Sequence, residues 1–226
     1  MRRLNIAIDG PAGAGKSTVA RKVAKELSMV YIDTGAMYRA LTWLAFEKKI
    51  NVDEEESLFH LLKESDIRFQ NEGEAILVKM NGEDVTEELR KTDITNFVSY
   101  TAKHPPIRRE MVRKQQLLAA EGGIVMDGRD IGTAVLPNAE VKIFLTASVE
   151  ERAKRRHEEQ LSKNMVSDFE QVKKEMAERD KIDTERDTDP LKKAEDAIEM
   201  DTTSLTVDDV VSRICQVAKE RDDTFE

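Results

Sequence analysis

Cysteine is almost absent from this sequence, and its scarcity limits the kinds of protein that the chain can be. The single cysteine, Cys215, rules out an internal disulfide and is typical of proteins from a reducing compartment. It lies on an apolar stripe with Val211, Ile214 and Val217. We therefore interpret it as a buried apolar thiol rather than a nucleophile.

Long apolar runs and positive net charge are missing too. Asp9 interrupts the first apolar run almost at once, so no secretory signal peptide is expected, and no segment approaches bilayer-spanning length. The formal net charge of -9 argues against general affinity for nucleic acids or anionic membranes. We predict a cytoplasmic, monomeric protein without nucleic-acid or membrane partners, in which local clusters of Arg and Lys hold any anionic ligand.

The remaining composition is that of one globular domain. With 226 residues, 39% of them hydrophobic and 36% charged, the chain can bury a substantial core. Its three histidines are scattered and lack the spacing of metal ligands, so a His/Cys metal site is not expected: His60, His104 and His157.

Short apolar runs alternate with amphipathic helical patterns along the chain. The runs are Leu4–Asp9, Met29–Asp33, Ile124–Asp127, Val141–Thr146 and Ile198–Asp201. This alternation predicts an α/β fold with three layers, a central parallel sheet covered by helices on both faces. Three runs end in aspartate, at Asp9, Asp33 and Asp127, and in such sheets the ligand crevice lies at the carboxyl ends of the strands.

Local signals mark several helix starts and one hairpin. Ser148, Ser167 and Thr206 each begin a capping-box pattern, and Pro105 with Pro106 predicts a helix that runs toward Glu121. Within 66–85, alternating runs followed by Asn81-Gly82 predict a small antiparallel sheet inserted into the core. From the pattern alone, this insertion is either decorative or functional.

The octet G-P-A-G-A-G-K-S, residues 10–17, matches the phosphate-binding pattern G-x-x-x-x-G-K-[ST] and lies between a predicted strand and a predicted helix. Glycines let backbone N–H groups turn toward a polyphosphate, and the helix N-terminus adds partial positive charge. Lys16 is expected to reach the β- and γ-phosphates, and the Ser17 hydroxyl to ligate Mg²⁺. An incidental glycine-rich turn is the alternative. The predicted ATP-binding residues are Gly10, Pro11, Ala12, Gly13, Ala14, Gly15, Lys16, Ser17 and Thr18.

Two further stretches suggest a second anion site. In D-T-G-A-M-Y-R, residues 33–39, the Thr34 hydroxyl and the Arg39 guanidinium could hold a phosphate after a turn at Gly35. In I-V-M-D-G-R-D, residues 124–130, a strand delivers Asp127 to the crevice, where it could position Mg²⁺ directly or through water. A solvated arginine in the first stretch and a structural Asp–Arg pair in the second are the alternatives.

Arginines recur farther along the chain, at Arg152, Arg155 and Arg156 and again at Arg179 and Arg186. A solvated helix face is the default interpretation. ATP and a nucleoside monophosphate together bring on the order of six negative charges into one cleft, however, and converging arginines would neutralise them. A phosphate acceptor is largely an anionic nucleophile at neutral pH, so no general base is needed and catalysis means positioning with charge stabilisation.

These motifs together resemble the bacterial cytidylate kinase (CMP kinase) family of nucleoside monophosphate kinases over nearly the full length. The P-loop is generic, whereas D-G-R-D-I-G-T, residues 127–133, with the inserted β segment, is much more specific. The resemblance implies a P-loop kinase core of about 1–36, 106–152 and 190–226, a monophosphate-binding region of about 37–105 that carries the antiparallel insertion, and a lid of about 153–189. It also implies the reaction ATP + (d)CMP → ADP + (d)CDP, with Mg²⁺ as cofactor.

The resemblance further implies roles for individual residues. The implied CMP-binding set is Thr34, Gly35, Tyr38 and Arg39, then Ser99 and Arg108, then Arg129 and Asp130, and finally Arg179, Asp183 and Arg186. Among these, Ser99, Arg108 and Asp130 correspond to the base-reading positions, Arg179 and Asp183 to the sugar, and Thr34, Arg39, Arg129 and Arg186 to the phosphate. The implied catalytic residues are Lys16, Asp127, Arg129, Arg156 and Arg179, and the metal ligands are Ser17 and Asp127.

Hydrogen-bond chemistry agrees with cytosine as the base. A carboxylate such as Asp130 and a hydroxyl such as Ser99 can accept from the exocyclic amino group, while an arginine donates to the ring acceptors. Uracil has a carbonyl oxygen in place of the amino group, so two hydrogen-bond acceptors would face each other. Binding of uracil is therefore strongly disfavoured. Arg108 and Arg109 are adjacent, and the pattern leaves open which of them contacts the base. Thr34 stands where relatives often have Ser, and its extra methyl narrows the pocket.

Other functions stay open at this stage. Another P-loop kinase, acting on UMP, dTMP or a metabolite hydroxyl, is the main rival, although a hydroxyl acceptor would need a base near it. A nucleotide-gated binding module without transfer activity is the second rival. The strings N-K-x-D and D-x-x-G, expected of a GTPase, do not occur in the sequence.

Overall fold

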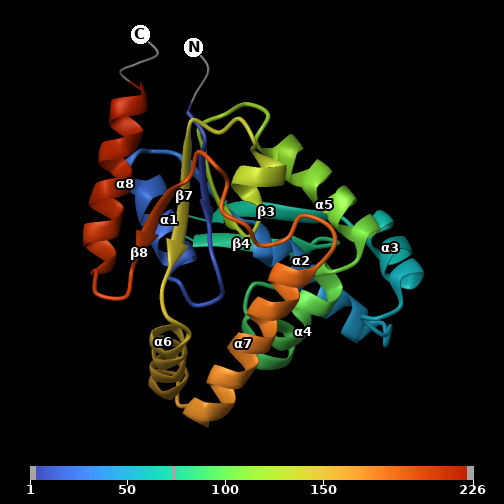
Figure 1. The fold of residues 1–226 in the computed structure, drawn as a ribbon. Helices are drawn as coiled ribbons and strands as arrows, with labels where there is room; N and C mark the ends of the chain where they lie inside the picture. The colour runs from blue at the N-terminus through green and yellow to red at the C-terminus, as the bar shows by residue number, and fades with distance from the viewer. Residues whose placement is uncertain (1–3, 73–74, 223–226) are drawn as a thin grey trace.

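A computed structural model describes residues 4–72 and 75–222 of the chain and shows a parallel sheet with helices on both faces (Figure 1). The sheet has the strand order β2-β6-β1-β7-β8, and all of its neighbouring strands pair in parallel. Its strands are β1 (Ile6–Asp9), β2 (Val30–Asp33), β6 (Ile124–Gly128), β7 (Val141–Thr146) and β8 (Ile198–Asp201). The predicted α/β core and its five strands are confirmed.

Alternate residues of the central strand face opposite layers, which explains why the sheet is buried on both sides. Ile6 and Ile8 of β1 pack with α1 (Lys16–Glu26) and α8 (Val207–Asp222). Ala7, between them, faces the other cluster, formed with the π-helical turn η2 (Ile131–Val135) and α5 (Pro105–Leu118). These two apolar layers fix the sheet, and with it the edge where β1, β2 and β6 end.

The C-terminal helix α8 packs as its apolar spacing predicts. Val210, Val211 and Ile214 are buried in the layer that α8 shares with α1. Cys215 is partly buried beside them, and burial raises the pKa of its thiol. The apolar surroundings predicted for Cys215 are confirmed, whereas its thiol is only partly buried.

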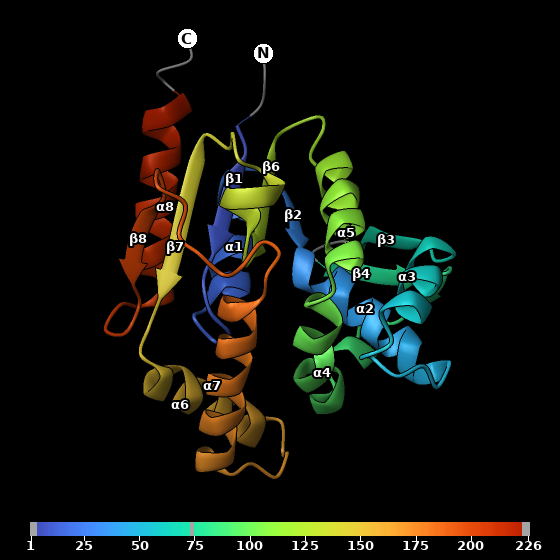
Figure 2. The ribbon, with the colours of Figure 1, turned by 45° about the vertical axis from the view of Figure 1, so that its right-hand side comes forward.

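A second lobe lies beside the sheet, at the right of Figure 2. It consists of helices packed around one apolar cluster and a small antiparallel sheet of order β3-β4-β5. Its elements are α2 (Thr34–Glu47), α3 (Glu55–Lys63), β3 (Ile67–Glu72), β4 (Ala75–Met80), β5 (Glu83–Asp84), the 3₁₀ turn η1 (Glu88–Arg90) and α4 (Thr92–Ala102).

The hairpin within this lobe turns where the sequence predicts. Met80 of β4 pairs with Glu83 of β5, so Asn81 and Gly82 form the two-residue turn. Their φ angles are 54° and 87°, both in the left-handed region that this turn type requires and that Asn-Gly tolerates. The predicted antiparallel insertion is confirmed.

The last elements, α6 (Val149–Ser162) and α7 (Phe169–Glu185), form a helical pair below the sheet in Figure 2. Ser148 caps α6, and Thr206 with Asp209 forms a reciprocal capping box before α8, as predicted. The prediction that Ser167 caps the helix α7 was wrong. Its hydroxyl donates to Gln160 instead, and Asp168 accepts the hydrogen bond from Gln171 N that begins α7. The helix that opens at Pro105 ends at Leu118, short of Glu121.

Candidate active site

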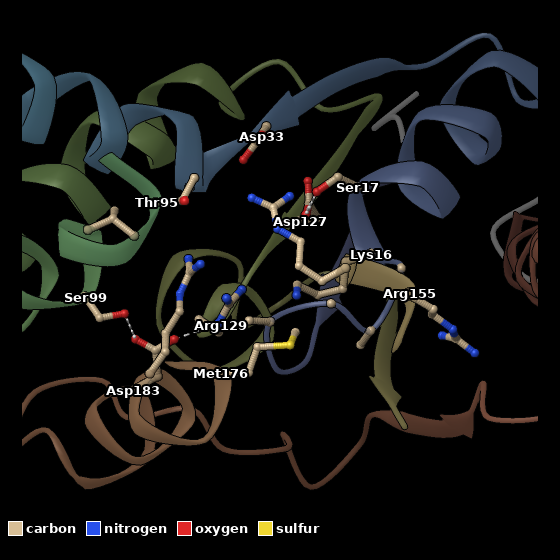
Figure 3. Close-up of a pocket in the computed structure, with 18 of the residues that line it drawn as sticks. Lys16, Ser17, Asp33, Thr95, Ser99, Asp127, Arg129, Arg155, Met176 and Asp183 are labelled. Carbon is tan, nitrogen blue, oxygen red and sulfur yellow. Dashed lines mark hydrogen bonds and ion pairs between the residues drawn. The ribbon is translucent and has the colours of Figure 1, made fainter. Parts of the chain in front are cut away.

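A deep cleft of about 1540 Å³ lies at the carboxyl ends of the central strands. The P-loop, the starts of α2 and α4, the loop after β6 and the helices α6 and α7 line it (Figure 3). Of the residues predicted to form the ATP and CMP sites, all but Gly10 and Pro11 line this cleft. The structure thus brings together side chains from segments that are far apart in the sequence.

The P-loop shapes one end of the cleft. Gly10 and Gly13 have φ angles of 146° and 74°, and a Cβ at Gly10 would overlap the carbonyl oxygen of Leu145 in β7. Lys16 is buried at the start of α1, and its ammonium donates to the carbonyl of Pro11 at 2.7 Å. Burial and the nearby Arg129 lower the pKa of Lys16 to about 7. An anionic group beside Lys16 would reverse this shift and favour the charged ammonium.

Asp127, at the end of β6, is the carboxylate nearest the P-loop hydroxyl. Its Oδ2 accepts from Ser17 Oγ at 2.8 Å and its Oδ1 from the Tyr31 hydroxyl at 2.8 Å. Burial, followed by repulsion from Asp33, raises the pKa of Asp127 to about 6. Ser17 and Asp127 therefore present two oxygen atoms to one point of the cleft (Figure 3).

Asp33 and Arg39 form an ion pair at the start of α2. The Asp33 side chain accepts from Ala36 N at 3.0 Å, which caps the helix, and from Arg39 Nη2 at 2.7 Å. Burial alone would raise the pKa of Asp33, but Arg39 outweighs it and holds that pKa below its usual value. Gly35 leaves room for this arrangement, because a Cβ there would lie 3.0 Å from Arg39 Nη1. The Thr34 hydroxyl donates to the backbone carbonyl of Asp127 at 2.7 Å.

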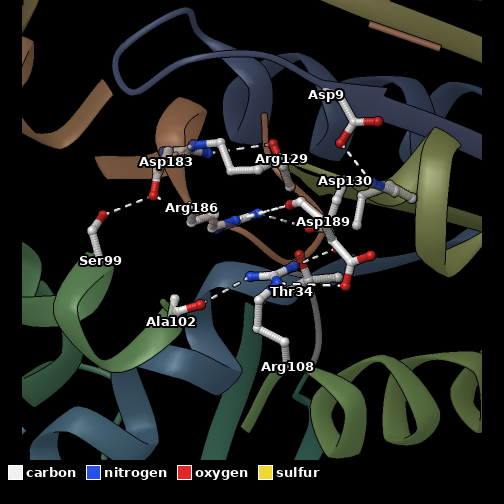
Figure 4. A network of polar contacts seen from close by, with 12 residues as sticks. Asp9, Thr34, Ser99, Ala102, Arg108, Arg129, Asp130, Asp183, Arg186 and Asp189 are labelled. Atoms are coloured by element: carbon white, nitrogen blue, oxygen red, sulfur yellow. Dashed lines mark hydrogen bonds and ion pairs between the residues drawn. The ribbon is translucent and has the colours of Figure 1, made fainter. Parts of the chain in front are cut away.

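A network of alternating carboxylates and guanidinium groups forms the other end of the cleft (Figure 4). Asp183 of α7 accepts from Ser99 Oγ at 2.9 Å and from Arg129 Nε at 2.9 Å. Asp130 accepts from Arg108 Nη2 at 2.5 Å. Arg186 lies between the two carboxylates, 3.6 Å from Asp130 and 3.7 Å from Asp183.

Arg108, rather than Arg109, reaches the cleft. It is 1% exposed, lies over the Tyr38 ring at 5.5 Å, and donates to the Ala102 carbonyl at 3.2 Å. Arg109 is exposed on the outer face of α5. Burial opposes the charged form of Arg108, but the Tyr38 hydroxyl and the carboxylates of Asp130 and Asp189 raise its pKa, so the guanidinium stays charged.

Arg179 of α7 also lines the cleft, near the carboxylate of Asp183. Its Nε is buried and, within the described ranges 4–72 and 75–222, has no hydrogen-bond partner. Burial, and then repulsion from Arg129, lower the pKa of Arg179 to about 10. Arg39 and Arg156 act on it in the same direction. Cationic side chains from four separate segments therefore converge on the region between the P-loop and the carboxylate network.

The neighbouring arginines at positions 152, 155 and 156 do not share one role. Arg156 lines the cleft and pairs with Glu159 on its own helix, at 2.9 Å. Arg155 donates to the carbonyl of Thr202 at 2.6 Å, in the loop before α8. Arg152 is buried against the P-loop instead, where it donates to the carbonyl of Ala12 at 2.8 Å.

Several residues of the site have no signal in the sequence that singles them out. Tyr31 sits inside an apolar strand, and Thr202 in a loop between β8 and α8. Met176 looks like an ordinary member of a polar helix, yet it contacts the P-loop, as does Asp180. Only tertiary packing reveals these contacts.

Comparison with known proteins agrees with this arrangement. The family model described as cytidylate kinase matches residues 6–220. Cytidylate kinases from Geobacillus sp. and Anoxybacillus flavithermus are each 60% identical to the chain, over 96% and 97% of it and 97% and 98% of their own lengths.

Among solved structures, the fold resembles a shikimate kinase from Bacteroides thetaiotaomicron, with a TM-score of 0.50 and 12% identity, over 96% of this chain and 98% of that one. The fold also resembles a gluconokinase from Sinorhizobium meliloti, with a TM-score of 0.50 and 13% identity, over 99% of this chain and 98% of that one. At such identities the likeness concerns the fold.

Proposed function

This chain belongs to the cytidylate kinase family, and we propose that it transfers the γ-phosphoryl group of ATP to CMP or dCMP, giving ADP and CDP or dCDP. The observation that carries the proposal is the convergence of Arg39, Arg129 and Arg179 opposite the P-loop lysine in one cleft. Two phosphate groups that must react have to be brought together against their mutual repulsion, and such a cationic cluster lowers that repulsion.

Residues 10–18 hold the donor in this proposal. The backbone N–H groups of the loop and the N-terminus of α1 face the polyphosphate, and Lys16 contacts the β- and γ-phosphates. The lowered pKa of Lys16 supports this role, because its buried charge lacks a full counter-ion among the described residues.

The acceptor occupies the opposite end of the cleft. The phosphate of the acceptor binds to Thr34, Arg39, Arg129 and Arg186. Its sugar contacts Arg179 and Asp183, and its base contacts Ser99, Arg108 and Asp130. The wall of the site is completed by Gly35 and Tyr38. The proximity of Arg186 to both Asp130 and Asp183 supports one continuous acceptor site. Arg39 and Arg129 are each paired with a carboxylate, so phosphate binding exchanges part of those ion pairs for contacts with the substrate.

Base selection follows from the polar groups at this end. The carboxylate of Asp130 accepts from the amino group of cytosine, with the Ser99 hydroxyl nearby, and Arg108 donates to the ring acceptors. With uracil, a carbonyl would meet the Asp130 carboxylate. A mismatch of this kind in a buried site discriminates by orders of magnitude.

The transfer step needs no general base. An oxygen of the acceptor phosphate, largely ionised because its second pKa is near 6, attacks the γ-phosphorus. A new P–O bond forms to the acceptor while the bond to the β–γ bridging oxygen breaks, and ADP leaves with that electron pair. Lys16, Arg129, Arg156 and Arg179 stabilise the charge on the transferred group.

The residues of the site also fit Mg²⁺ as a cofactor. Mg²⁺ prefers hard oxygen ligands, and in phosphoryl-transfer sites one or two protein oxygens with substrate phosphates suffice. The hydroxyl of Ser17 and the carboxylate of Asp127, 2.8 Å apart, are such a pair and would hold the ion directly or through water. When bound, Mg²⁺ neutralises phosphate charge during transfer.

Regions 37–105 and 153–189 act in this proposal as the monophosphate-binding region and the lid, around a core of 1–36, 106–152 and 190–226. No helix in the described part of the chain is long and apolar enough to cross a membrane. A cytoplasmic location and a monomeric state remain predictions from the sequence.

A coupled assay of ADP release with CMP, dCMP, UMP, AMP and dTMP as acceptors tests the proposal. We expect the highest kcat/KM with CMP or dCMP. The highest value with AMP or dTMP would overturn the choice of substrate, and ATP consumption that does not depend on any acceptor would overturn the assignment as a nucleotide kinase.

A further inference from the structure

Helix α7 packs directly on the tip of the P-loop. A Cβ at Gly13 would overlap Met176 Cε and would lie 3.2 Å from Arg152 Cβ. Met176 belongs to a small apolar cluster with Ala12, Ala153 and Val172, which joins the loop to α6 and α7. The tip of the phosphate-binding loop is therefore covered by the same helix that carries Arg179 and Asp183.

A polar contact reinforces this apolar one. Arg152 is 3% exposed, and its Nη1 donates to the carbonyl of Ala12 at 2.8 Å while pairing with Asp180 Oδ2 at 2.7 Å. The other carboxylate oxygen of Asp180 accepts from Ala12 N at 3.4 Å. Both backbone groups of Ala12 are thus bound by an ion pair between α6 and α7, in which Arg152 is buried and Asp180 is partly buried.

Helix α7 also contacts α4 of the second lobe and Arg129 at the edge of the central sheet. Asp183 accepts from Ser99 and Arg129, and Glu178 accepts from the Tyr100 hydroxyl at 2.9 Å. Glu178, Arg179 and Asp180 are consecutive. One helical turn therefore touches α4, the centre of the cleft and the P-loop.

We propose that Asp180 and Arg152 are positioning residues that couple the donor loop to the acceptor site through α7. The proposal rests on the function proposed above. Asp180 holds α7 against Ala12, and this contact sets the position of the Arg179 side chain between the two phosphate groups. ATP bound to the P-loop and CMP bound against Asp183 then favour the same position of α7, packed on the P-loop. Each ligand therefore raises the affinity of the protein for the other ligand.

Neither residue needs to touch a reacting atom for this role. If Asp180 is replaced, Arg152 keeps its bonds to the carbonyls of Ala12 and Ala147, so the P-loop retains a partner. What is lost is the link from that loop to α7. The expected defect is therefore in the placement of Arg179, which acts in the transfer step, rather than in binding of CMP alone.

The test compares the full-length wild type with Asp180→Asn, and uses Glu185→Gln as the matched change of an exposed carboxylate on the same helix. The Kd of CMP is measured by calorimetry with and without an ATP analogue whose β–γ bridge is an imido group, and kcat by ADP release. We expect the analogue to tighten CMP binding about tenfold in the wild type and in Glu185→Gln, and less than about threefold in Asp180→Asn. We expect kcat to fall at least about tenfold in Asp180→Asn only, with the Kd of CMP alone changed less than about threefold.

A second variant, Met176→Ala, weakens the same contact between α7 and the P-loop without changing a charge. It replaces Asp180→Asn in the test if that variant does not fold. We expect the same loss of coupling between the two ligands and the same fall in kcat. The inference would be overturned if Asp180→Asn showed the same ligand coupling and the same kcat as the wild type, or if Met176→Ala did so where Asp180→Asn does not fold. The proposed phosphorylation of CMP would stand in that case. A wild-type chain that phosphorylates no CMP would overturn the proposed function and the inference with it.

Discussion

Ser99 and Asp183 lie 84 positions apart in the chain and form a buried hydrogen bond, with 2.9 Å between Oγ and Oδ1. The bond joins α4 of the second lobe to α7, and Arg129 of the sheet edge pairs with the same carboxylate. Side chains from three parts of the fold therefore meet at one carboxylate. The acceptor end of the cleft is assembled by tertiary contacts, and its function depends on how those parts are held together.

Replacing Asp130 by Asn is expected to reduce the preference for CMP over UMP at least about tenfold, because an amide can turn its NH₂ group toward the carbonyl of uracil. The ratio of kcat/KM for the two acceptors measures this, and the KM of ATP should stay unchanged. Because Arg108 is 1% exposed and loses the nearer of its two anionic partners, Asp130 and Asp189, the free energy of unfolding should also fall, by about 2 kcal/mol. An unaltered CMP-to-UMP ratio would contradict the role assigned to Asp130.

Replacing Arg179 by Gln is expected to separate activity from stability. The kcat should fall at least about a hundredfold, since a charge that stabilises the transferred group is removed. The unfolding free energy without nucleotides should rise by about 1 kcal/mol, because burial and Arg129 disfavour the charged guanidinium, as its lowered pKa indicates. Urea unfolding and ADP release measure the two effects. Arg113→Gln, on the exposed face of α5, is the control; a stability loss in Arg179→Gln would count against this account.

Much of the fold could be predicted from the sequence because its signals are local. Each central strand is a short apolar run, and Asn81-Gly82 specifies its own turn through two positive φ angles. The phosphate-binding loop is equally local, because its glycines and Lys16 act through the backbone that carries them.

The failures have the opposite cause. Ser167 has the residue type of a helix cap, but Gln160 of α6 takes its hydroxyl, and the cap moves to Asp168. The contact between Asp180 and Ala12 spans 168 positions, so no spacing or periodicity points to it. The choice between Arg108 and Arg109 depends on which side of α5 faces the second lobe, and only the packing settles their placement.

Gly10→Ala should destabilise the protein far more than Gly82→Ala. A Cβ at Gly10 would overlap the carbonyl oxygen of Leu145, whereas nothing lies within 4 Å of a Cβ at Gly82. Both glycines have positive φ, so the control carries only the backbone strain of about 1 kcal/mol. We expect Gly10→Ala to lose at least about 3 kcal/mol of unfolding free energy in urea, together with ATP binding. Equal losses would show that β7 does not confine the loop.

The pH dependence of stability should reveal Asp9, which accepts from the backbone N–H groups of Ile131 and Gly132. Burial raises the pKa of Asp9 to about 7 against those two hydrogen bonds, with Asp130 raising it and Lys16 lowering it. Between its ordinary pKa of 3.8 and 7, the folded state then binds a proton that the unfolded state does not, so the contribution of Asp9 to stability falls as pH rises.

Asp9→Asn removes this dependence. The unfolding free energy of the wild type, measured relative to that of Asp9→Asn, should therefore decrease from pH 4 to pH 7, by about 2–4 kcal/mol. Asp208→Asn, which changes an exposed carboxylate of α8, should leave the wild-type slope as it is. A constant or increasing difference between the wild type and Asp9→Asn would contradict the buried, proton-binding state of Asp9.

The acceptor specificity of the wild-type chain tests the central claim most directly, namely that one cleft holds a triphosphate on the P-loop and a cytidine monophosphate against Arg129, Asp130 and Asp183. Initial rates with ATP and Mg²⁺ are measured for CMP, dCMP, UMP, AMP and dTMP at several concentrations of each. The account predicts that CMP or dCMP gives the highest kcat/KM, with UMP behind and AMP and dTMP near background. Turnover that is best with AMP or dTMP, or ATP consumption without any acceptor, would contradict it.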